Sequence, residues 1–219
     1  MKLKNLLLSA VLLGCAASPA MATIPYYGGS FAKEFNRVNL GYEATFTRGN
    51  GKKDFYDNKF NFNGLVLKYN HGWRMMKSAP LYLEAGLRFT ADFWSAPKDP
   101  LGNKASMSML TLGIPVNVSY QFPLTKALSL QPYTGFGFKF NLMANYKYGD
   151  LSYSMFSDKG PEKWKRFQMG WQIGLGVNFT SFYLGLEYGI DFLKLGNHIN
   201  TSHLEVSVGG KYLVTSRTQ

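Results

Sequence analysis

The sequence of 219 residues has one cysteine, Cys15, and beyond its first residues it has no apolar run long enough to form a membrane-spanning helix. Cys15 falls in a segment that we expect to be removed, so disulfide bonds and cysteine metal sites are excluded from the mature chain. Acidic residues are few, with 13 Asp and Glu against 24 Lys and Arg. Apolar residues nevertheless make up 46% of the chain. Apolar residues that are frequent but not gathered into long runs indicate strands with one apolar and one polar face.

The first 22 residues have the features of a secretory signal peptide. Lys2 and Lys4 form a basic start, Leu6–Leu13 forms an apolar stretch, and Ala20–Ala22 forms an A-x-A cleavage site. We expect cleavage after Ala22, which leaves residues 23–219 as one domain.

Leu12–Cys15 is a second possible processing site, because its Leu-Leu-Gly-Cys sequence resembles a lipobox. Cleavage there would precede Cys15 and leave that residue acylated. We favour cleavage after Ala22, since a protein whose strands already lie in a membrane gains little from a lipid anchor.

The net charge of the chain is +11, and it falls to +9 when Lys2 and Lys4 are removed with the signal peptide. A basic balance often indicates nucleic-acid binding, but an exported protein rarely meets nucleic acid. Phosphorylated lipid head groups are the acidic partners that we expect instead. The simpler alternative is a solvated basic surface without a specific ligand.

The alternation of apolar and polar residues is clearest between Phe167 and Phe192. Successive side chains of a strand point to opposite faces, so Phe167–Phe179 and Phe182–Phe192 each predict a strand with one apolar face. The polar pair Thr180–Ser181 joins them in a tight turn, which predicts a hairpin. Each strand is about as long as the ~9–11 residues with which a tilted strand crosses a bilayer.

The same pattern predicts six further strands, and therefore an all-β fold, an eight-stranded antiparallel up-and-down transmembrane β-barrel. The further strands are Val38–Phe46, a stretch ending at Trp73, Leu81–Phe93, Leu110–Phe122, Leu128–Leu142 and Leu204–Tyr212. Long connections (Arg48–Asn58, Ser95–Lys104, Met143–Arg166 and Leu193–Ser202) alternate with short ones (Arg74–Pro80, Pro123–Ala127 and Thr180–Ser181). Because outer-membrane barrels have long outer loops and short periplasmic turns, we expect the long connections outside the cell.

Within each predicted strand, the charged residues occupy the positions that alternate with the apolar ones, so all of them fall on the polar face. They are Glu43, Lys68, Glu84, Arg88, Asp92, Lys139, Glu187, Asp191, Glu205 and Lys211. The polar face is also rich in glycine, which makes room in the narrow interior of an eight-stranded barrel. Aromatic residues mark the strand ends on the apolar face, as they do at the two head-group levels of a membrane. We therefore expect the polar face inside and the apolar face against lipid, not the reverse arrangement of a soluble lipocalin-like barrel.

Two features interrupt this pattern. Phe60 and Phe62 have the parity opposite to Leu65, which predicts a β-bulge near Asn63–Gly64. Pro115 lies inside a predicted strand, where it requires a bulge or a lost hydrogen bond.

Three segments carry a family resemblance. Leu112–Phe122 (LGIPVNVSYQF) resembles the Ile-Pro-containing fourth strand of the PorT-like outer-membrane β-barrel domain common in Bacteroidetes, and Leu130–Phe140 (LQPYTGFGFKF) resembles the Pro-Tyr-x-Gly-x-Gly strand that follows it. Val208–Tyr212 is similar to the Gly-x-Lys-aromatic final strand of that family. The resemblance covers roughly the whole mature chain and implies a small outer-membrane barrel without implying one role. The chain departs from the family by continuing beyond the final aromatic residue with Leu213–Gln219.

The sequence contains no nucleotide, phosphate-binding or metal-ligand motif, so no cofactor or metal is expected. Ser202, His203 and Glu205 suggest a lipid-acyl hydrolase, but barrel deacylases carry a His-x-Ser spacing on a strand, which this sequence lacks. We therefore expect a protein that is not an enzyme, with a lipid A-modifying barrel enzyme as an alternative.

The inward-facing charges form the first candidate site: Glu43, Glu84, Arg88, Lys139, Glu187, Glu205 and Lys211. We expect them at comparable depth and joined by salt bridges, because ionisable groups removed from water persist only when they are paired. A structural polar core is the favoured interpretation, and a path for ions or small solutes is the alternative.

The longest connection, Met143–Arg166, is the second candidate site. Aromatic and basic residues together are typical of interaction surfaces. The expected contact residues are Tyr153, Phe156, Lys159, Lys163 and Trp164. The alternative is that this segment only prolongs its flanking strands beyond the membrane.

Together these features predict a monomeric protein of the bacterial outer membrane with a structural, adhesive or accessory role in the envelope or in secretion. The expected partners are outer-membrane lipid, lipopolysaccharide and a protein bound through the outer loops, and nucleic acid is not expected. A narrow channel for small solutes is the main alternative function.

Overall fold

Strands account for most of the described chain. The computed structural model describes residues 31–49, 61–98, 102–157, 163–196 and 199–213. The strands are β1 (Glu34–Gly49), β2 (Asn61–Arg74), β3 (Leu81–Lys98), β4 (Lys104–Tyr120), β5 (Phe122–Pro123), β6 (Leu128–Tyr148), β7 (Leu151–Ser154), β8 (Phe167–Phe179), β9 (Phe182–Asp191) and β10 (Ile199–Leu213). In these ranges, no helix is long and apolar enough to cross a membrane.

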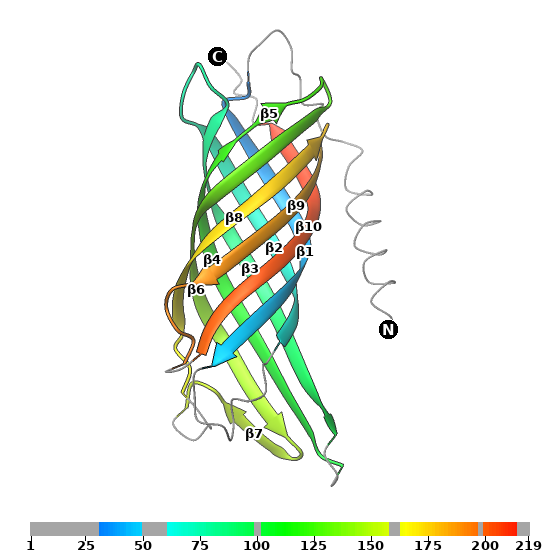
Figure 1. The fold of residues 1–219 in the computed structure, drawn as a ribbon, viewed down its shortest axis with the longest axis vertical. Helices are drawn as coiled ribbons and strands as arrows, with labels where there is room; N and C mark the ends of the chain where they lie inside the picture. Colours follow the sequence, from blue (N-terminus) through cyan, green and yellow to red (C-terminus); the bar gives the residue numbers. More distant parts are fainter. Residues whose placement is uncertain (1–30, 50–60, 99–101, 158–162, 197–198, 214–219) are drawn as a thin grey trace, which may run out of the picture.

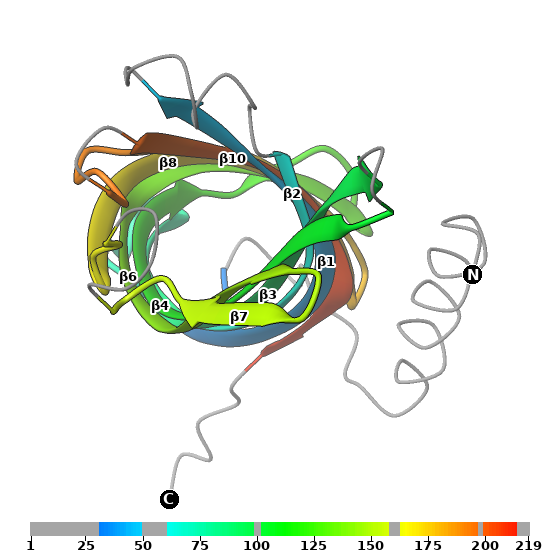
Figure 2. The ribbon, with the colours of Figure 1, turned by 90° about the horizontal axis from the view of Figure 1, so that it is seen from below.

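Eight of the described strands close into an antiparallel barrel (Figure 1). Their order around the wall is β4, β3, β2, β1, β10, β9, β8 and β6, and pairing of β4 with β6 completes the ring. The first and last strands pair along their length, with Leu40 opposite Val208. The view along the barrel axis shows the closed ring (Figure 2), and the short strands β5 and β7 both pair with β6. The predicted eight-stranded antiparallel barrel is confirmed.

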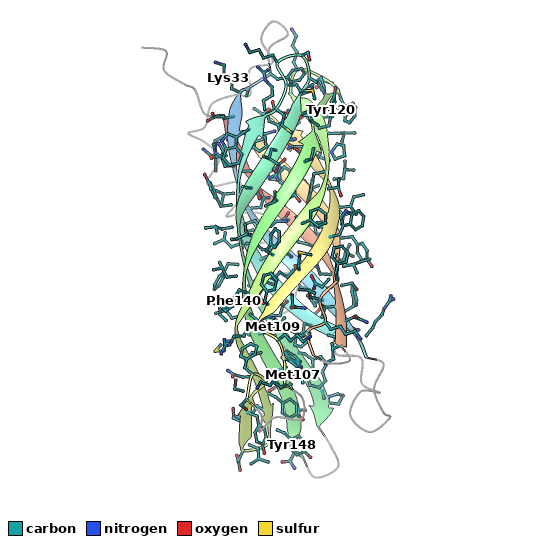
Figure 3. The ribbon with its side chains drawn as sticks, turned by 90° about the vertical axis from the view of Figure 1, so that its left-hand side faces the viewer. Lys33, Met107, Met109, Tyr120, Phe140 and Tyr148 are labelled. Carbon is teal, nitrogen blue, oxygen red and sulfur yellow. The ribbon has the colours of Figure 1, made fainter. Side chains whose placement is uncertain are left out.

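Apolar side chains cover the outer surface of the barrel (Figure 3). On β2, Leu65, Leu67 and Tyr69 are 43%, 52% and 43% exposed, whereas Val66 and Lys68 between them are 1% and 4% exposed. A continuous exposed apolar surface is costly in water and stable in contact with lipid chains. The apolar face is therefore outside and the polar face inside, as predicted.

The strands run further than predicted at the end of the barrel that carries the long connections, here called the long-loop end. β3 continues to Lys98 and β6 continues to Tyr148, where β7 pairs back onto it. The predictions of Ser95–Lys104 and Leu193–Ser202 as loops were therefore wrong in part, because residues 95–98, 104 and 199–202 lie in strands. Their residues lack the apolar alternation of a lipid-facing strand, so the sequence pattern did not predict strands there. Their backbones nevertheless pair with neighbouring strands. The opposite end, with the short connections, is here called the short-turn end.

β3, β4, β6 and β7 project beyond the other strands at the bottom of Figure 1. This projection, here called the extended sheet, consists of residues 93–98, 104–109, 144–148 and 151–154. Gly149 lies in the turn between β6 and β7 with φ 55°, in the left-handed region that glycine adopts without steric cost. The first part of Met143–Arg166 thus prolongs the barrel wall.

The predicted bulge near Asn63–Gly64 is wrong, because β2 keeps a continuous register against β1 and β3 through its described residues. Phe62 simply faces inward and is 0% exposed, since the interior becomes apolar at this end. The register shifts instead between β4 and β6. Leu110 pairs with Met143 and Thr111 with Asn141, so the β4–β6 ladder skips Leu142. Leu142 and Met143 both face outward.

Pro115 lies within β4 without a bulge. It pairs with Gly137 of β6 in continuous register, whereas the described ladder between β4 and β3 is interrupted between Val116 and Gly113. Proline has no amide hydrogen to donate, which accounts for the interruption. Of the two predicted outcomes, the structure shows the lost hydrogen bond.

Candidate functional site

Arg88 occupies the centre of the barrel interior. Its Nη1 donates to Glu187 Oε1 at 2.6 Å, its Nη2 lies 3.1 Å from Glu205 Oε2, and it also pairs with Glu43. The cation comes from β3 and the carboxylates come from β9, β10 and β1, so the ion pairs cross the interior. Each of these side chains is at most 5% exposed. Charges buried to this extent are stable only when they are paired. Removing any one of these side chains would therefore leave an unpaired charge in the interior and lower the stability of the barrel.

Lys68 on β2 adds a second cation. Its ammonium lies 2.6 Å from Glu205 Oε1 and 3.2 Å from Glu187 Oε2. The hydroxyl of Tyr133 donates to Glu187 Oε2 at 2.9 Å, and His203 Nε2 lies 3.5 Å from Glu187 Oε1. The buried carboxylates thus receive cations and neutral donors from several strands. We call this group the central cluster: Glu43, Lys68, Arg88, Glu187 and Glu205.

A second network lies toward the short-turn end. Arg37 Nη2 donates to Glu84 Oε2 at 2.6 Å, and Gln131 Nε2 donates to Glu84 Oε1 at 2.7 Å. Lys211 Nζ donates to Gln131 Oε1 at 3.0 Å and to Gln121 Oε1 at 3.2 Å. Side-chain amides therefore link two buried cations through one carboxylate.

A third group lies between the central cluster and the long-loop end. Lys139 Nζ is 3.0 Å from Asp191, and the hydroxyl of Thr201 donates to Asp191 Oδ2 at 2.6 Å. A cavity of about 20 Å³ remains beside this pair and is also lined by Asp92 and Gln168. A cavity of this size holds about one water molecule, so it is not a solute passage.

The structure places all of the charged residues predicted for the interior inside the barrel, but in three groups. Glu43, Arg88, Glu187 and Glu205 belong to the central cluster, Glu84 and Lys211 to the network at the short-turn end, and Lys139 to the pair with Asp191. The prediction of one common depth was wrong, because positions four residues apart on a strand, such as Glu84 and Arg88, are separated by about 13 Å along it.

The candidate site predicted from the sequence did not include Arg37 or Lys68, although both belong to the interior networks. Arg37 immediately precedes the predicted start of the first strand, so its parity was not considered. Lys68 shares the inward parity of the other charges, and this signal was sufficient to include it. Both cations are needed to balance the buried carboxylates.

Aromatic side chains fill the interior at the short-turn end. Phe35, Tyr82 and Tyr183 are each at most 1% exposed, and we call them the aromatic floor. The rings of Phe35 and Tyr82 meet edge to face with centroids 5.2 Å apart. The Arg37 guanidinium lies 4.3 Å from the Tyr183 ring centroid and the Lys211 ammonium 4.1 Å from that of Phe35. The floor therefore both closes this end and stabilises two buried cations through their contact with aromatic faces.

An apolar cluster fills the interior at the long-loop end. Its buried members, here called the apolar cap, are Phe62, Met107, Met109, Ala144, Met155, Trp164, Leu195 and Ile199. Figure 3 shows Met109 and Met107 on the side of the barrel toward Tyr148. The rings of Phe62 and Trp164 meet edge to face with centroids 6.3 Å apart. In the described part of the chain, side chains thus fill the barrel from the aromatic floor to the apolar cap.

The prediction of Trp164 as a contact residue is wrong. Its side chain is 4% exposed within the apolar cap, because a large ring is needed to fill the mouth of the barrel. Phe156 packs against the cap and is partly buried, and the Arg166 guanidinium lies over its ring at 4.2 Å. These two of the five predicted contact residues therefore serve packing.

The other predicted contact residues lie closer to solvent. Tyr153 is half-buried on β7 opposite Tyr146, and Lys163 is exposed. Lys159 lies outside the described residues. The longest connection thus leaves Lys163 as its most accessible predicted contact in the described ranges.

Exposed cations gather at the long-loop end. Among the described residues there, seven Lys and Arg side chains are exposed against one acidic side chain, that of Asp150. This basic rim consists of Arg48, Lys104, Lys147, Lys163, Lys165, Arg166 and Lys194. Lys165 and Lys194 flank β8 and β9 next to Phe167 and Phe192, which are 48% and 54% exposed. The rim therefore borders the apolar belt, where membrane head groups would lie.

Ser202 and His203 are placed on opposite faces of β10. His203 is 2% exposed inside the barrel, and Ser202 has the outward parity, so the two side chains do not face each other. His198 lies outside the described residues. In the ranges that the structure describes, no group of three or more His, Cys, Asp and Glu side chains is arranged to hold a metal ion.

Comparison with known families gives one match. The family described as "Outer membrane protein beta-barrel domain" matches residues 30–193, which is more than half of the chain. A search of curated proteins gave no match.

Several solved barrels are similar in structure. Ail, the attachment invasion locus protein of Yersinia pestis, in complex with the heparin analogue sucrose octasulfate, is 14% identical, with 82% of this chain and 99% of that chain covered and a TM-score of 0.47. Neisserial surface protein A is 16% identical, with 82% and 97% covered and a TM-score of 0.47. The outer membrane enzyme PagL is 11% identical, with 80% and 99% covered and a TM-score of 0.43.

Proposed function

The chain belongs to the outer membrane protein beta-barrel domain family, and from this premise we propose that it is a sealed barrel with a structural or adhesive role on the cell surface. Its location is the bacterial outer membrane. In such barrels the long loops are extracellular, so we assign the long-loop end to the outside. The observation that carries the proposal is the filled interior, because it leaves the outer surface as the functional part of the protein.

The filled interior argues against the channel alternative. A solute crossing the barrel would have to displace the aromatic floor, the ion pairs of the central cluster and the apolar cap in turn. Separating the buried ion pairs is costly, because each charge left behind lies out of water. The interior therefore serves as a rigid core that holds the extended sheet and the basic rim at the membrane surface.

The interior also argues against catalysis. His203 and Glu205 face inward into the central cluster, where Glu205 pairs with Lys68 and Arg88, and Ser202 has the opposite parity. A nucleophile and its base must lie within hydrogen-bond reach. We therefore propose a role without catalysis, and without a cofactor.

The basic rim supports binding to lipopolysaccharide. Its exposed cations outnumber the exposed acidic side chains among the described residues at this end and lie where the phosphates of the outer leaflet are found. Opposite charges attract most strongly near a low-dielectric boundary. Lys163, Lys165, Arg166 and Lys194 occupy one side of the rim, next to the outer ends of β8 and β9. A protein partner bound through the same surface is the second possibility.

Two measurements test this function. Purified protein in planar bilayers should show no large steady conductance. A variant with Lys163, Lys165, Arg166 and Lys194 changed to Gln should keep its heat-modifiable mobility and retain measurably less of the lipopolysaccharide that purifies with the wild type. The matched control changes the exposed short-turn cations Lys33, Lys77 and Lys126 to Gln and should retain it. A stable ion conductance, or unchanged lipopolysaccharide in the rim variant, would overturn the proposal.

Within the family, we also propose a place among PorT-like barrels and removal of residues 1–22 as a signal peptide. The first rests on the motifs Leu112–Phe122 and Leu130–Phe140 and the second on the A-x-A site at Ala20–Ala22.

A further inference from the structure

The outer face of the extended sheet changes character between two adjacent rows of paired residues. The last apolar row crosses four strands as Leu65, Ala91, Leu110 and Met143, which are paired in that order. A row of this kind continues the apolar belt of the barrel. The boundary of the belt on this side is therefore fixed to one row of residues.

The next row toward the outside is mostly polar. It consists of Asn63, Phe93, Ser108 and Asn145, again paired in order across β2, β3, β4 and β6. Rows two residues apart on a strand are separated by about 7 Å. The change from apolar to polar side chains thus takes place over the width of one row.

A second polar row follows and includes a cation. Ser95 pairs with Ser106, Ser106 with Lys147, and Lys147 with Ser152 of β7. The two rows line a groove of about 760 Å³, in which Lys147 is the charged side chain of the described lining. A volume of this size is within the range of small-molecule sites.

The groove has a firm base. The inward-facing neighbours of its residues on β4, Met107 and Met109, belong to the apolar cap, as does Ala144 beside Asn145. Side chains packed on the inner face hold the strands in place, so the outer face is presented without rearrangement.

The groove has the chemistry of a carbohydrate site. Amide and hydroxyl side chains both donate and accept hydrogen bonds, as sugar hydroxyls do. Phe93 is 56% exposed and offers an aromatic face to the apolar side of a sugar ring. Protein interfaces are poor in Ser and Lys and rich in large anchors, which the groove lacks apart from Phe93 and Trp94.

The position of the groove selects the source of the sugar. Most of its lining residues have the outward parity of their strands, and the groove begins one row beyond residues that face lipid chains. At this level the neighbours of an outer-membrane barrel are the sugars nearest to the lipid anchor of the surrounding glycolipid. Lys147 would pair with phosphate or carboxylate groups on those sugars.

We propose that this groove binds the phosphorylated inner sugars of a lipopolysaccharide molecule in the same membrane. The inference rests on the proposed function in that both place the long-loop end outside, but it assigns a specific site distinct from the Lys163–Lys194 side of the rim. Bound glycolipid would hold the extended sheet upright at the membrane surface.

The test uses the full-length protein in detergent and core oligosaccharide released by mild acid from rough lipopolysaccharide. Asn145→Trp fills the groove from its outward face, and Asn200→Trp makes the same change at an exposed position of β10 outside the groove lining. Binding is measured by saturation-transfer NMR and titration. We expect Asn145→Trp to weaken binding by at least about tenfold, and Asn200→Trp to leave it within about twofold of the wild type.

Three results would overturn the site. They are unchanged binding in Asn145→Trp, no binding of the core oligosaccharide by the wild type, and binding of dextran or a sulfated glycan as strong as that of the core oligosaccharide. The third result would indicate a general glycan or polyanion surface. Conductance and the Gln variants of the rim are measured separately, so the site can fail while the sealed-barrel function stands.

Discussion

Arg88 on β3 and Glu187 on β9 join opposite walls of the barrel through an ion pair of 2.6 Å. In the ring order, β3 and β9 are four strands apart in either direction, so they are as far from each other as two strands of this wall can be. The two residues are 99 positions apart in the sequence. The pair thus ties together strands that share no backbone hydrogen bonds.

Arg88→Ala should destabilise the barrel by about 3–5 kcal/mol, because it leaves Glu187, Glu205 and Glu43 with one less cation in a buried position. The measurement is the unfolding free energy in urea, followed by the mobility of unboiled samples. Lys126→Ala, at an exposed cation of a short turn, is the control and should change the unfolding free energy by less than about 0.5 kcal/mol. Equal stability of the two variants would show that Arg88 contacts water.

The apolar cap should control access to the interior from the outside. Ala144→Cys, in a Cys15→Ser background, places a thiol at a position that is 1% exposed, so a charged methanethiosulfonate reagent should label it slowly. Adding Trp164→Ala removes the largest ring of the cap and should speed labelling by about tenfold or more, while costing about 3–5 kcal/mol of stability. Rapid labelling with Trp164 in place would contradict a closed cap.

Thr180→Gly should stabilise the hairpin of β8 and β9. Thr180 has φ 56°, a left-handed conformation that costs a β-branched residue about 1–2 kcal/mol and costs glycine nothing. Part of this gain is offset by the greater freedom of glycine in the unfolded chain, so we expect a net gain of about 0.5–1 kcal/mol. Ser181→Gly, at the neighbouring turn position, should give no gain. The midpoint temperature of the heat-induced mobility shift measures both.

Cleavage after Ala22 predicts a mature protein that begins at Thr23. Amino-terminal sequencing of the protein from outer membranes should read Thr-Ile-Pro-Tyr. Labelling by radioactive palmitate that is lost in Cys15→Ser would instead show processing at Leu12–Cys15.

The hairpin Phe167–Phe179 and Phe182–Asp191 shows how much of the wall follows from sequence alone. Its outward-facing residues contact lipid, which is apolar everywhere along the wall. Each of these positions therefore requires an apolar residue, whatever the rest of the chain does, and the pattern can be recognised from the local sequence. The same holds for the inward parity of the charges. Alternation was therefore sufficient to predict the strands, their faces and the closed ring.

Alternation failed where strands leave the lipid. At the long-loop end, β3, β4 and β6 carry Ser, Asn and Lys on the face that points away from the barrel. This composition resembles that of a loop, but the segments form strands because their backbones pair with neighbouring strands. Phe62 predicted a bulge because an inward aromatic residue conflicts with a polar interior. It belongs instead to an apolar cap, whose members come from distant segments.

The sequence by itself thus determined the eight strands, the inside and outside of the barrel, and most of the charges that lie within it, although it missed Arg37. The tertiary structure alone decided which charges meet, because the tilt and stagger of the strands set the depth of each residue, and a parity pattern contains no information about depth. For this reason Glu84 pairs with Arg37 and not with the central cluster, and Trp164 packs within the apolar cap, where it is 4% exposed. The polar groove likewise exists only because four strands align Asn63, Phe93, Ser108 and Asn145 in one row.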